Sequence, residues 1–447
     1  MSRRVVITGL GVVSPFGYGA GTLWDALIDG RSAIKRISGF DPSGFACQFA
    51  AAADDVSARE YVPKSYRKAL KVMARDTELA VVAAKLAVED AGLVTKGTLG
   101  DEASGGAAVT YPPERFGCQI GAGLIAAEVP ELGAAMSTSA FEGGKFDYAK
   151  WGAPGGGMEN LTPLWLLKYL PNMLACHVTI IHDAQGPSNT ITCGEASGGL
   201  SVGESVRVIE RGAADLCFSG GAESKLNHMG MIRQEFAGRI GKITESEGWR
   251  AVRPYDPASS GAVIGEGGGI VIVEALEKAQ ARGAKAYAEV LGIGAGQSRA
   301  RGAELYEPSG EGLRCAIENA LEDAGVSAGE IDAIVPQAAS SKAADEAEAA
   351  ALRAVFGSRL AEVPLVTLTP NIGNTHAGEG GIQASVAALC LKHGMLPARL
   401  HAGTPAKDLQ AGACGARDAR LRRILTCSAS LGGQNAALVL GAISNGS

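Results

Sequence analysis

The stretch SNTITCGEASGGLSVGE, residues 188–204, predicts a short strand that turns sharply through glycine into a helix. The strand is expected over 189–193, and the helix that follows is rich in small side chains. Sharp strand-to-helix turns often carry a nucleophile. This turn offers Cys193, Glu195 and Ser197. The exposed amides of a helix N-terminus would lower the pKa of a thiol at this place and would hold a glutamate ionised.

The overall composition is that of an ordinary globular protein, with 46% apolar and 20% charged residues among 447. This length suits two or three average domains or one large duplicated unit. The net charge of −6 argues against a nucleic-acid binder, which needs a basic face. No apolar run approaches roughly 20 residues, so no membrane span is expected. The N-terminal MSRRVVITGLGVV is broken by glycine and is interpreted as a first strand, not a signal peptide.

Motifs for metals and cofactors are missing from the sequence. The nine cysteines form no CxxC pair and are odd in number, which predicts reduced thiols in a cytoplasmic protein. The six histidines show neither HxxxH nor HExxH spacing. TGLGVVSPFG (8–17) lacks the third glycine of a dinucleotide fingerprint, and GEGGG (265–269) lacks the lysine and hydroxyl residue of a phosphate loop. We therefore expect no metal and no cofactor.

Strand-like and helical segments alternate along the chain. Residues 214–221 and 265–275 are apolar runs typical of buried strands, whereas 76–92 repeats apolar side chains at helical spacing. Asp76 or Thr77 is expected to cap that helix. The alternation predicts an α/β protein with largely parallel, buried sheets.

A sequence pattern that occurs twice in the chain indicates duplication. AVEDAGL (87–93) and ALEDAGV (320–326) share one pattern, and each ends an amphipathic helix that leads toward a buried strand. Because the element order is similar in both halves, we interpret the chain as two copies of one α/β unit packed face to face. The join is expected near 255–285. We divide the chain into residues 1–265, which carry the elbow, and residues 266–447, which together form one compact pseudo-twofold unit.

Longer blocks of the sequence resemble a known family. They are RRVVITGLGVVSPFG (3–17), GRSAIKRISGFDPSGF (30–45), LPNMLACHVTI (170–180), GPSNTIT (186–192), RPYDPASSGAVIGEGGGIVIVEALEKAQARGAKAYAEV (253–290) and LGGQNAALVLG (431–441). Over nearly its whole length the chain resembles the β-ketoacyl-acyl carrier protein synthases, the condensing enzymes of fatty acid and polyketide biosynthesis. The resemblance implies the thiolase fold, a duplicated five-layer αβαβα sandwich. It also implies acyltransferase ancestry, a dimer and an acyl carrier protein as partner.

The resemblance implies where a catalytic site would lie. Active members use a cysteine at the elbow, two histidines and a supporting lysine. The cysteine takes the acyl chain as a thioester, and the histidines help to decarboxylate the malonyl unit and to stabilise the enolate oxygen. Counting back from Gly220–Gly221 through Asp215 places the cysteine position at Glu195, two residues after Cys193. The residue at the tip of the turn therefore cannot form the usual thioester.

The other catalytic positions are replaced as well. Counting back from Asp345 puts Gln337 at the first histidine. The run NIGNTHAGEGG puts Asn374 at the second histidine, or Thr375 in a register one residue longer, and Thr369 stands at the lysine position. The framework blocks remain while the catalytic positions are lost. This pattern is expected of a protein selected for its fold and its partner surface.

The turn that carries the gating phenylalanine in the family consists here of Leu431, Gly432 and Gly433, and the RDGF before the GEG motif becomes SSGA (259–262). Both changes are expected to open the space near the elbow. In the family, the amides of the elbow residue and of this turn form the oxyanion hole. Our hypothesis is that the carboxylate of Glu195 fills that hole and blocks acyl loading. The simpler interpretation is that it caps the helix.

Two functions from different classes remain open. The first is a pseudoenzyme that resembles a chain-length factor, pairs with a catalytic ketosynthase and shapes a shared acyl tunnel. Such members usually carry glutamine at the elbow, so Glu195 departs from their pattern. The helical region 161–179 would contribute to the dimer face. The second is an enzyme with altered acyl-transfer or decarboxylation activity, in which Glu195 is a base or Cys193 is a displaced nucleophile near His376.

Simpler alternatives accompany both functions. Cys193 is expected to be a small buried residue and His376 an exposed loop histidine. Ordinary condensation would remain if the register were wrong. A homodimeric scaffold without catalysis is the last alternative.

Overall fold

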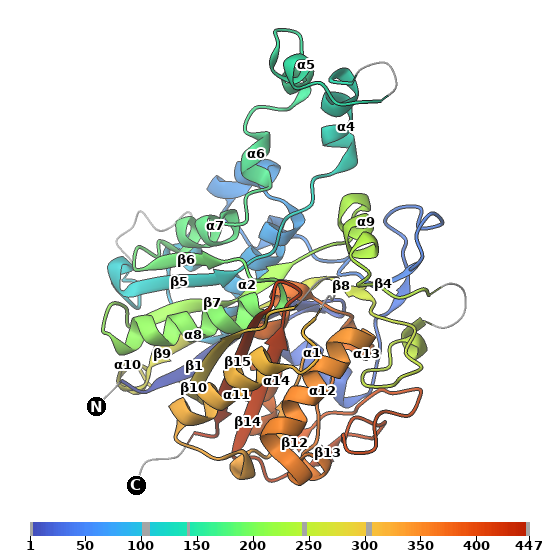
Figure 1. Cartoon of the computed structure of the whole chain (residues 1–447). Coiled ribbons are helices and arrows are strands. Elements are labelled where there is room, and N and C mark those ends of the chain that lie inside the picture. Colours follow the sequence, from blue (N-terminus) through green and yellow to red (C-terminus); the bar gives the residue numbers. More distant parts are fainter. Residues whose placement is uncertain (1–2, 101–107, 141–143, 244–247, 301–305, 444–447) are drawn as a thin grey trace.

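The structure, a computed structural model, describes residues 3–100, 108–140, 144–243, 248–300 and 306–443. Its strands form a ten-stranded sheet that divides into two parts (Figure 1). The first part has the order β6 (Ser188–Ile191), β5 (Phe116–Gly121), β7 (Leu216–Glu223), β9 (Gly267–Ala275) and β1 (Val5–Ser14). The second has the order β10 (Ala288–Gln297), β15 (Gln434–Gly441), β14 (Arg423–Ala429) and β11 (Ala333–Val335). β1 meets β10 only at Val6–Glu289 and Ile7–Ala288, which form the seam between the parts.

Helices cover the two parts of the sheet in layers (Figure 1). α2 (Arg75–Asp90) and α7 (Met173–His182) pack on the first part, and α8 (Ser197–Glu210) and α14 (Glu379–His393) lie between the parts. α11 (Glu311–Ala324) covers the second part with α12 (Lys342–Phe356) beside it. Leu79, Val82 and Ala83 of α2 are buried, and the helix packs against β1, β9 and β7. The expected five-layer αβαβα fold is confirmed.

The two middle helices approach each other closely because small residues line their contact. A Cβ added at Gly198 would come within 2.9 Å of the carbonyl oxygen of Ala377 and within 3.0 Å of the amide nitrogen of Gly381. A larger side chain would push α14 away from the elbow. Close approach therefore explains the run of small residues after the turn.

Strand directions are mixed. β5, β6 and β7 are parallel, as are β11 and β14, but β9 and β15 run antiparallel to their neighbours. The prediction of largely parallel sheets is wrong at these two strands; for β15 the short turn from β14 permits only an antiparallel return. β9 pairs with β1 and β7, so it belongs with the first half although it lies beyond residue 265. We propose that the halves meet between α10 (Leu276–Ala281) and β10.

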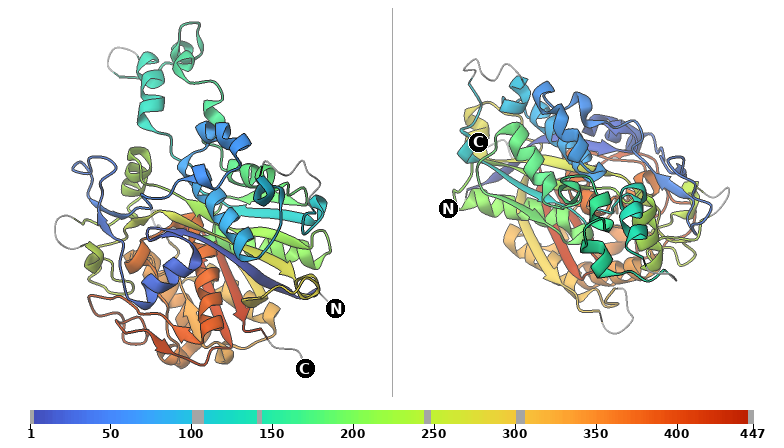
Figure 2. Two further views of the ribbon diagram at one scale, coloured as in Figure 1. Left: turned by 180° about the vertical axis from the view of Figure 1, so that it is seen from behind. Right: turned by 90° about the horizontal axis from the view of Figure 1, so that it is seen from above.

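A long excursion, residues 124–172, stands away from the body, and we call it the arm (Figures 1 and 2). It contains α4 (Val129–Thr138), α5 (Tyr148–Gly152) and α6 (Trp165–Lys168). Leu164 and Leu166 on the arm are 65% and 60% exposed. No helix in the described part of the chain is both long and apolar enough to cross a membrane.

Shorter elements complete the periphery of the fold. The short strands are β2 (Gly17–Tyr18), β3 (Lys35–Arg36), β4 (Phe49–Ala51), β8 (Ile264–Gly265), β12 (Met395–Leu396) and β13 (Arg417–Asp418). The other α-helices are α1 (Ala20–Ile28), α3 (Lys96–Leu99), α9 (His228–Phe236) and α13 (Thr369–Ile372). Two single turns of 3-10 helix matter below, η6 (Gly194–Ala196) and η10 (His376–Gly378).

Candidate functional site

The elbow lies between β6 and α8, as the sequence predicted. Gly194 has a φ of 56°, and a Cβ there would come within 3.0 Å of the Cβ of Ser430, so glycine suits the turn. The hydroxyl oxygen of Ser197 accepts a hydrogen bond from the amide of Cys193 at 2.7 Å and donates to the carbonyl oxygen of Ala122 at 3.3 Å. Ser197 therefore holds the turn together, and Glu195 occupies its tip.

Glu195 is completely buried, and its carboxylate faces two side chains. Arg239 donates a hydrogen bond to Oε1, and Nδ1 of His376 lies 3.2 Å from the same oxygen. Oε2 has no hydrogen-bond partner among the described residues. The hypotheses that this carboxylate caps the helix or binds the amide of Leu431 are therefore wrong. A buried carboxylate needs a charged or hydrogen-bonding partner, and here a distant arginine supplies it.

His376 is buried, not exposed as expected. It opens η10 with a φ of 51°, and its amide donates to Oδ1 of Asn374 at 2.8 Å, which fixes this unusual backbone. Burial above all, together with the charges of Arg239 and Lys225 and against the opposing charge of Glu223, lowers the pKa of His376 to about 3. The imidazole is therefore neutral at pH 7, and a proton on Nδ1 is needed to donate to Glu195.

The three residues predicted to stand at the remaining catalytic positions all form hydrogen bonds with backbone groups. Oε1 of Gln337 accepts from the amide of Ala429 at 2.9 Å, while its Nε2 has no partner in the described part of the chain. Oδ1 of Asn374 is occupied by the amide described above. Thr369 donates its hydroxyl proton to the carbonyl oxygen of Ala338 at 2.6 Å. None of these groups can supply the cationic or basic chemistry of a histidine or lysine.

A second buried ion pair lies behind His376. Lys225 pairs with Oε1 of Glu223 and donates to the carbonyl oxygen of Leu124 at 2.7 Å. The amide of Ala377 donates to Oε2 of Glu223 at 2.9 Å. Burial would raise the pKa of Glu223, but the charge of Lys225 and these hydrogen bonds outweigh it and the pKa is lowered. The pair fixes the backbone on which His376 sits.

Glu379 brings a further carboxyl group to this buried region. It begins α14, is buried, and its Oε2 has no partner among the residues that the structure describes. Burial raises its pKa well above the usual range, the charge of Glu348 adds to this, and the charge of Arg239 opposes it.

Leu431, Gly432 and Gly433 form the turn between β14 and β15. The amide of Gly433 donates to the carbonyl oxygen of Ser430 at 2.9 Å, and the amide of Ser298 donates to the carbonyl oxygen of Gly433 at 2.6 Å. Leu431 packs against Tyr306 and three alanines of the second half. A cavity of about 350 Å³ opens beside this turn.

Cys193 is half-buried and is not an activated thiol. Burial raises its pKa above the ordinary value, contrary to the lowering expected from a helix N-terminus. The reason is local geometry, because η6 separates Cys193 from the first turn of α8. The described residues contain no group of three side chains placed to hold a metal ion.

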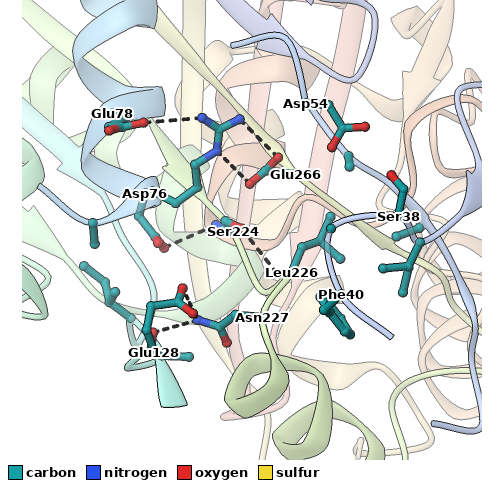
Figure 3. Close-up of a pocket in the computed structure, with 18 of the residues that line it drawn as sticks. Ser38, Phe40, Asp54, Asp76, Glu78, Glu128, Ser224, Leu226, Asn227 and Glu266 are labelled. Carbon is teal, nitrogen blue, oxygen red and sulfur yellow. Dashed lines mark hydrogen bonds and ion pairs between the residues drawn. The ribbon is translucent and has the colours of Figure 1, made fainter. Parts of the chain in front are cut away.

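A second cavity, of about 430 Å³, lies at the base of the arm (Figure 3). Arg75 pairs with Glu266 and Glu78 in its wall. Asp76 does not cap α2 as expected; its Oδ1 accepts from the amide of Ser224 at 3.2 Å. Burial raises the pKa of Asp76 to about 7, with Glu223 adding and Lys225 opposing. Since the charges of Arg75 are matched within the wall, they do not select a charged ligand.

Sequence reasoning missed Arg239, Lys225 and Glu379. The one usable signal was Glu195 itself, because a carboxylate predicted at a buried turn requires a nearby cation. Arg239 lies 44 positions away in the sequence, in the turn after α9. Only the folded chain shows which of the many arginines and lysines provides the charge.

Comparison with known proteins agrees with this architecture. Residues 2–279 match the family model "Beta-ketoacyl synthase, N-terminal domain", and residues 287–403 match "Beta-ketoacyl synthase, C-terminal domain". The chain belongs to the β-ketoacyl synthase family. A 3-oxoacyl-[acyl-carrier-protein] synthase 2 of Staphylococcus aureus is 29% identical over 440 residues, 98% of both chains. A putative polyketide β-ketoacyl synthase 1 of Streptomyces halstedii is 32% identical over 448 residues, again 98% of both.

Solved β-ketoacyl synthase structures share the fold. The structure described as "The ishigamide ketosynthase/chain length factor" has a TM-score of 0.81 at 28% identity and covers 99% of this chain and 100% of its own. A β-ketoacyl synthase from Burkholderia phymatum STM815 has a TM-score of 0.83 at 23% identity, with the same coverage, and supports the fold alone.

Proposed function

We propose that this β-ketoacyl synthase homologue does not condense acyl groups itself and acts as a chain-length-factor-like subunit of a catalytic ketosynthase. The observation that carries the proposal is the Glu195–Arg239 pair at the elbow. A carboxylate at this place cannot hold a transferable acyl thioester. Gln337 and Asn374 lack the acid–base chemistry of the two histidines, and their carbonyl oxygens are already bound to backbone amides.

Two surfaces support a partner of the same fold. β6 is an edge strand that pairs with β5 alone in the described sheet, and two of its four residues are exposed. The unpaired backbone groups of such an edge can pair with another chain. The arm adds the exposed leucines Leu164 and Leu166, as an interface would require. The similarity to a structure described as a ketosynthase with a chain length factor agrees with this partner. We further propose an acyl carrier protein as the carrier of the substrate.

Co-expression with a ketosynthase that retains cysteine and both histidines tests the proposal. We expect a stable complex on size-exclusion chromatography, and a product chain length that differs from that of the ketosynthase alone. Glu195→Gln should leave both the complex and the product unchanged, because the elbow of this subunit carries no acyl group. Failure to form a complex with ketosynthases encoded beside it would contradict the proposal.

A second candidate function is decarboxylation of malonyl carrier protein by this chain alone. The contact between His376 and Glu195 favours it, because a carboxylate bound to an imidazole is a common acid–base unit. The purified chain is incubated with malonyl carrier protein, and release of carbon dioxide with formation of acetyl carrier protein is measured. Activity abolished by Glu195→Ala would support this second function over the first.

A further inference from the structure

Arg239 reaches the elbow from the end of a peripheral helix. The amides of Ala237, Gly238 and Arg239 donate to carbonyl oxygens of α9, so a compact turn closes the helix and fixes the base of the side chain. Arg239 then spans the gap to Glu195. No catalytic position carried over from the family includes this arginine.

Exposure increases in one direction across the three grouped side chains. The side chain of Glu195 is 1% exposed, that of His376 is 5% and that of Arg239 is 13%. The side chain of Arg239 is thus the most exposed of the three, and that of Glu195 the least. A molecule that approaches Glu195 from this side must displace Arg239 and break a charge-assisted hydrogen bond to a fully buried carboxylate.

Unpartnered polar atoms gather behind the guanidinium. Oε2 of Glu195, Nε2 of His376 and Oε2 of Glu379 are buried and have no hydrogen-bond partner in the described residues. The charge of Arg239 also acts on the pKa values of His376 and Glu379. A purely structural ion pair normally satisfies its polar atoms, so this arrangement points to a role beyond support of the fold.

We propose that Arg239 is a specificity-determining gate: its side chain closes the approach to the elbow and excludes acyl chains from position 195 of this subunit. The inference rests on the proposed function, since an acyl group then loads only on the cysteine of the catalytic partner. Arg239 positions Glu195 and bars the entrance, and it takes no part in bond making. Loss of Arg239 should therefore change access to position 195 and not the fold.

Alkylation of a cysteine placed at the elbow tests the gate. Glu195→Cys and Glu195→Cys/Arg239→Ala are treated as full-length chains with iodoacetamide and with its N-dodecyl derivative; in both reactions the thiolate displaces iodide and forms a carbon–sulfur bond. The rate at position 195 is followed by peptide mass spectrometry, which separates it from the nine native cysteines. The ratio of the dodecyl rate to the small-reagent rate is the readout, because a change in thiolate fraction alters both rates equally.

We expect the ratio to rise by roughly tenfold in Glu195→Cys/Arg239→Ala, because the long arginine side chain, which in Glu195→Cys still lies in the approach to position 195 and can pair with the new thiolate, has been removed. Arg233, exposed on the same helix, provides the matched control, and Glu195→Cys/Arg233→Ala should keep the ratio of Glu195→Cys. Equal ratios in all three variants would overturn the gate. Glu195→Cys/Arg239→Gln, which removes the charge with a smaller loss of volume, repeats the comparison if the alanine variant folds poorly.

The proposed function and the proposed Arg239 gate can each be overturned without the other. Alkylation uses this chain alone, so it does not depend on a ketosynthase partner. A raised ratio in a chain that binds no ketosynthase would overturn the proposed function and leave the gate standing. An unchanged ratio in a chain that forms the complex would overturn the gate alone.

Discussion

Two buried arginine–glutamate pairs in this molecule are built differently. In the wall of the cavity in Figure 3, Arg75 donates to both carboxylate oxygens of Glu266, to Glu78 and to the carbonyl oxygens of Val56 and Ala53. The amide of Ala53 donates back to Glu266 at 2.9 Å. Arg75 and Glu266 are thus each tied to several neighbours, and the pair joins α2 to the residue before β9 and to the loop after β4.

The elbow pair has far fewer bonds. Arg239 donates to Glu195, and three polar atoms around it stay without partners in the described part of the chain, on Glu195, His376 and Glu379. Buried polar networks that are fully satisfied make a fold rigid, whereas unsatisfied groups cost stability and usually have another role. We interpret the difference as a division of roles, in which Arg75 supports the fold and Arg239 is the proposed gate of the elbow.

Arg75→Ala should give the largest loss of stability. It leaves Glu266 buried without its cation, and breaking such a pair costs about 3–5 kcal/mol in free energy of unfolding. Urea unfolding at pH 7 measures the loss. Arg314→Ala is the control, because its pair with Glu318 is at the surface and should cost about 0.5 kcal/mol or less. A loss at Arg75 no greater than at Arg314 would remove the basis of the comparison.

Asp76, in the same cavity, should make the protein less stable as the pH rises. Its folded pKa of about 7 lies above the unfolded value of 3.8, so from about pH 4 to 7 the folded chain holds a proton that the unfolded chain has lost. Asp76→Asn should abolish this slope and raise stability at pH 8, by up to about 4 kcal/mol at 1.4 kcal/mol per pKa unit. Parallel slopes for both proteins in urea unfolding from pH 5 to 8 would contradict this.

His376, at the elbow, should have the opposite pH dependence. Its folded pKa of about 3 lies below the unfolded value of 6.5, so stability is lost as the pH falls from 6.5 toward 3. The loss should reach about 3 kcal/mol by pH 4. His376→Gln should flatten this acid limb in the same urea experiment while leaving the slope due to Asp76. An unchanged acid limb would show that the histidine is not buried in solution.

Arg239→Ala should cost less than Arg75→Ala, about 2 kcal/mol, because it removes one hydrogen bond to a charged group and leaves His376 beside Glu195. The double variant Arg239→Ala/Glu195→Gln should recover most of this loss, since no unpaired charge then stays buried. Chemical denaturation of the four proteins forms a double-mutant cycle. If Arg239→Ala lost as much unfolding free energy as Arg75→Ala, and the double variant did not recover it, both pairs would be structural.

Cys193→Ser should have the smallest effect. The side chain is half-buried with a raised pKa, and the turn is held by the amide of residue 193, not by its sulfur. We expect a change within about 0.5 kcal/mol in unfolding free energy. The native protein and Cys193→Ser are each incubated with an acyl thioester and their intact masses are measured. We expect no difference in acylation between them. Acylation of the native protein that is absent from Cys193→Ser would restore Cys193 as the displaced nucleophile.

The parts of the fold that follow local rules were predictable. The turn at 188–204, α2 and the duplicated α/β order follow from glycine placement and apolar periodicity. The antiparallel direction of β9 was not predictable, because strand direction depends on which strands meet in space, whereas the short turn between β14 and β15 already implied an antiparallel return. Asp76 was misjudged for a similar reason: a carboxyl group in a first helical turn normally caps the helix, but here Ser224 lies within reach of it.

The sequence by itself determined that the elbow carries a carboxylate, and it predicts that amides and a hydroxyl stand where the family has histidines and a lysine, because both follow from residue identity and register. Tertiary structure alone decided what the carboxylate does. Glu195 is held by Arg239 and His376, residues 44 and 181 positions away, and not by the amide of Leu431. A buried charge takes whichever partner the packed chain brings within hydrogen-bond distance, and no local pattern encodes that choice.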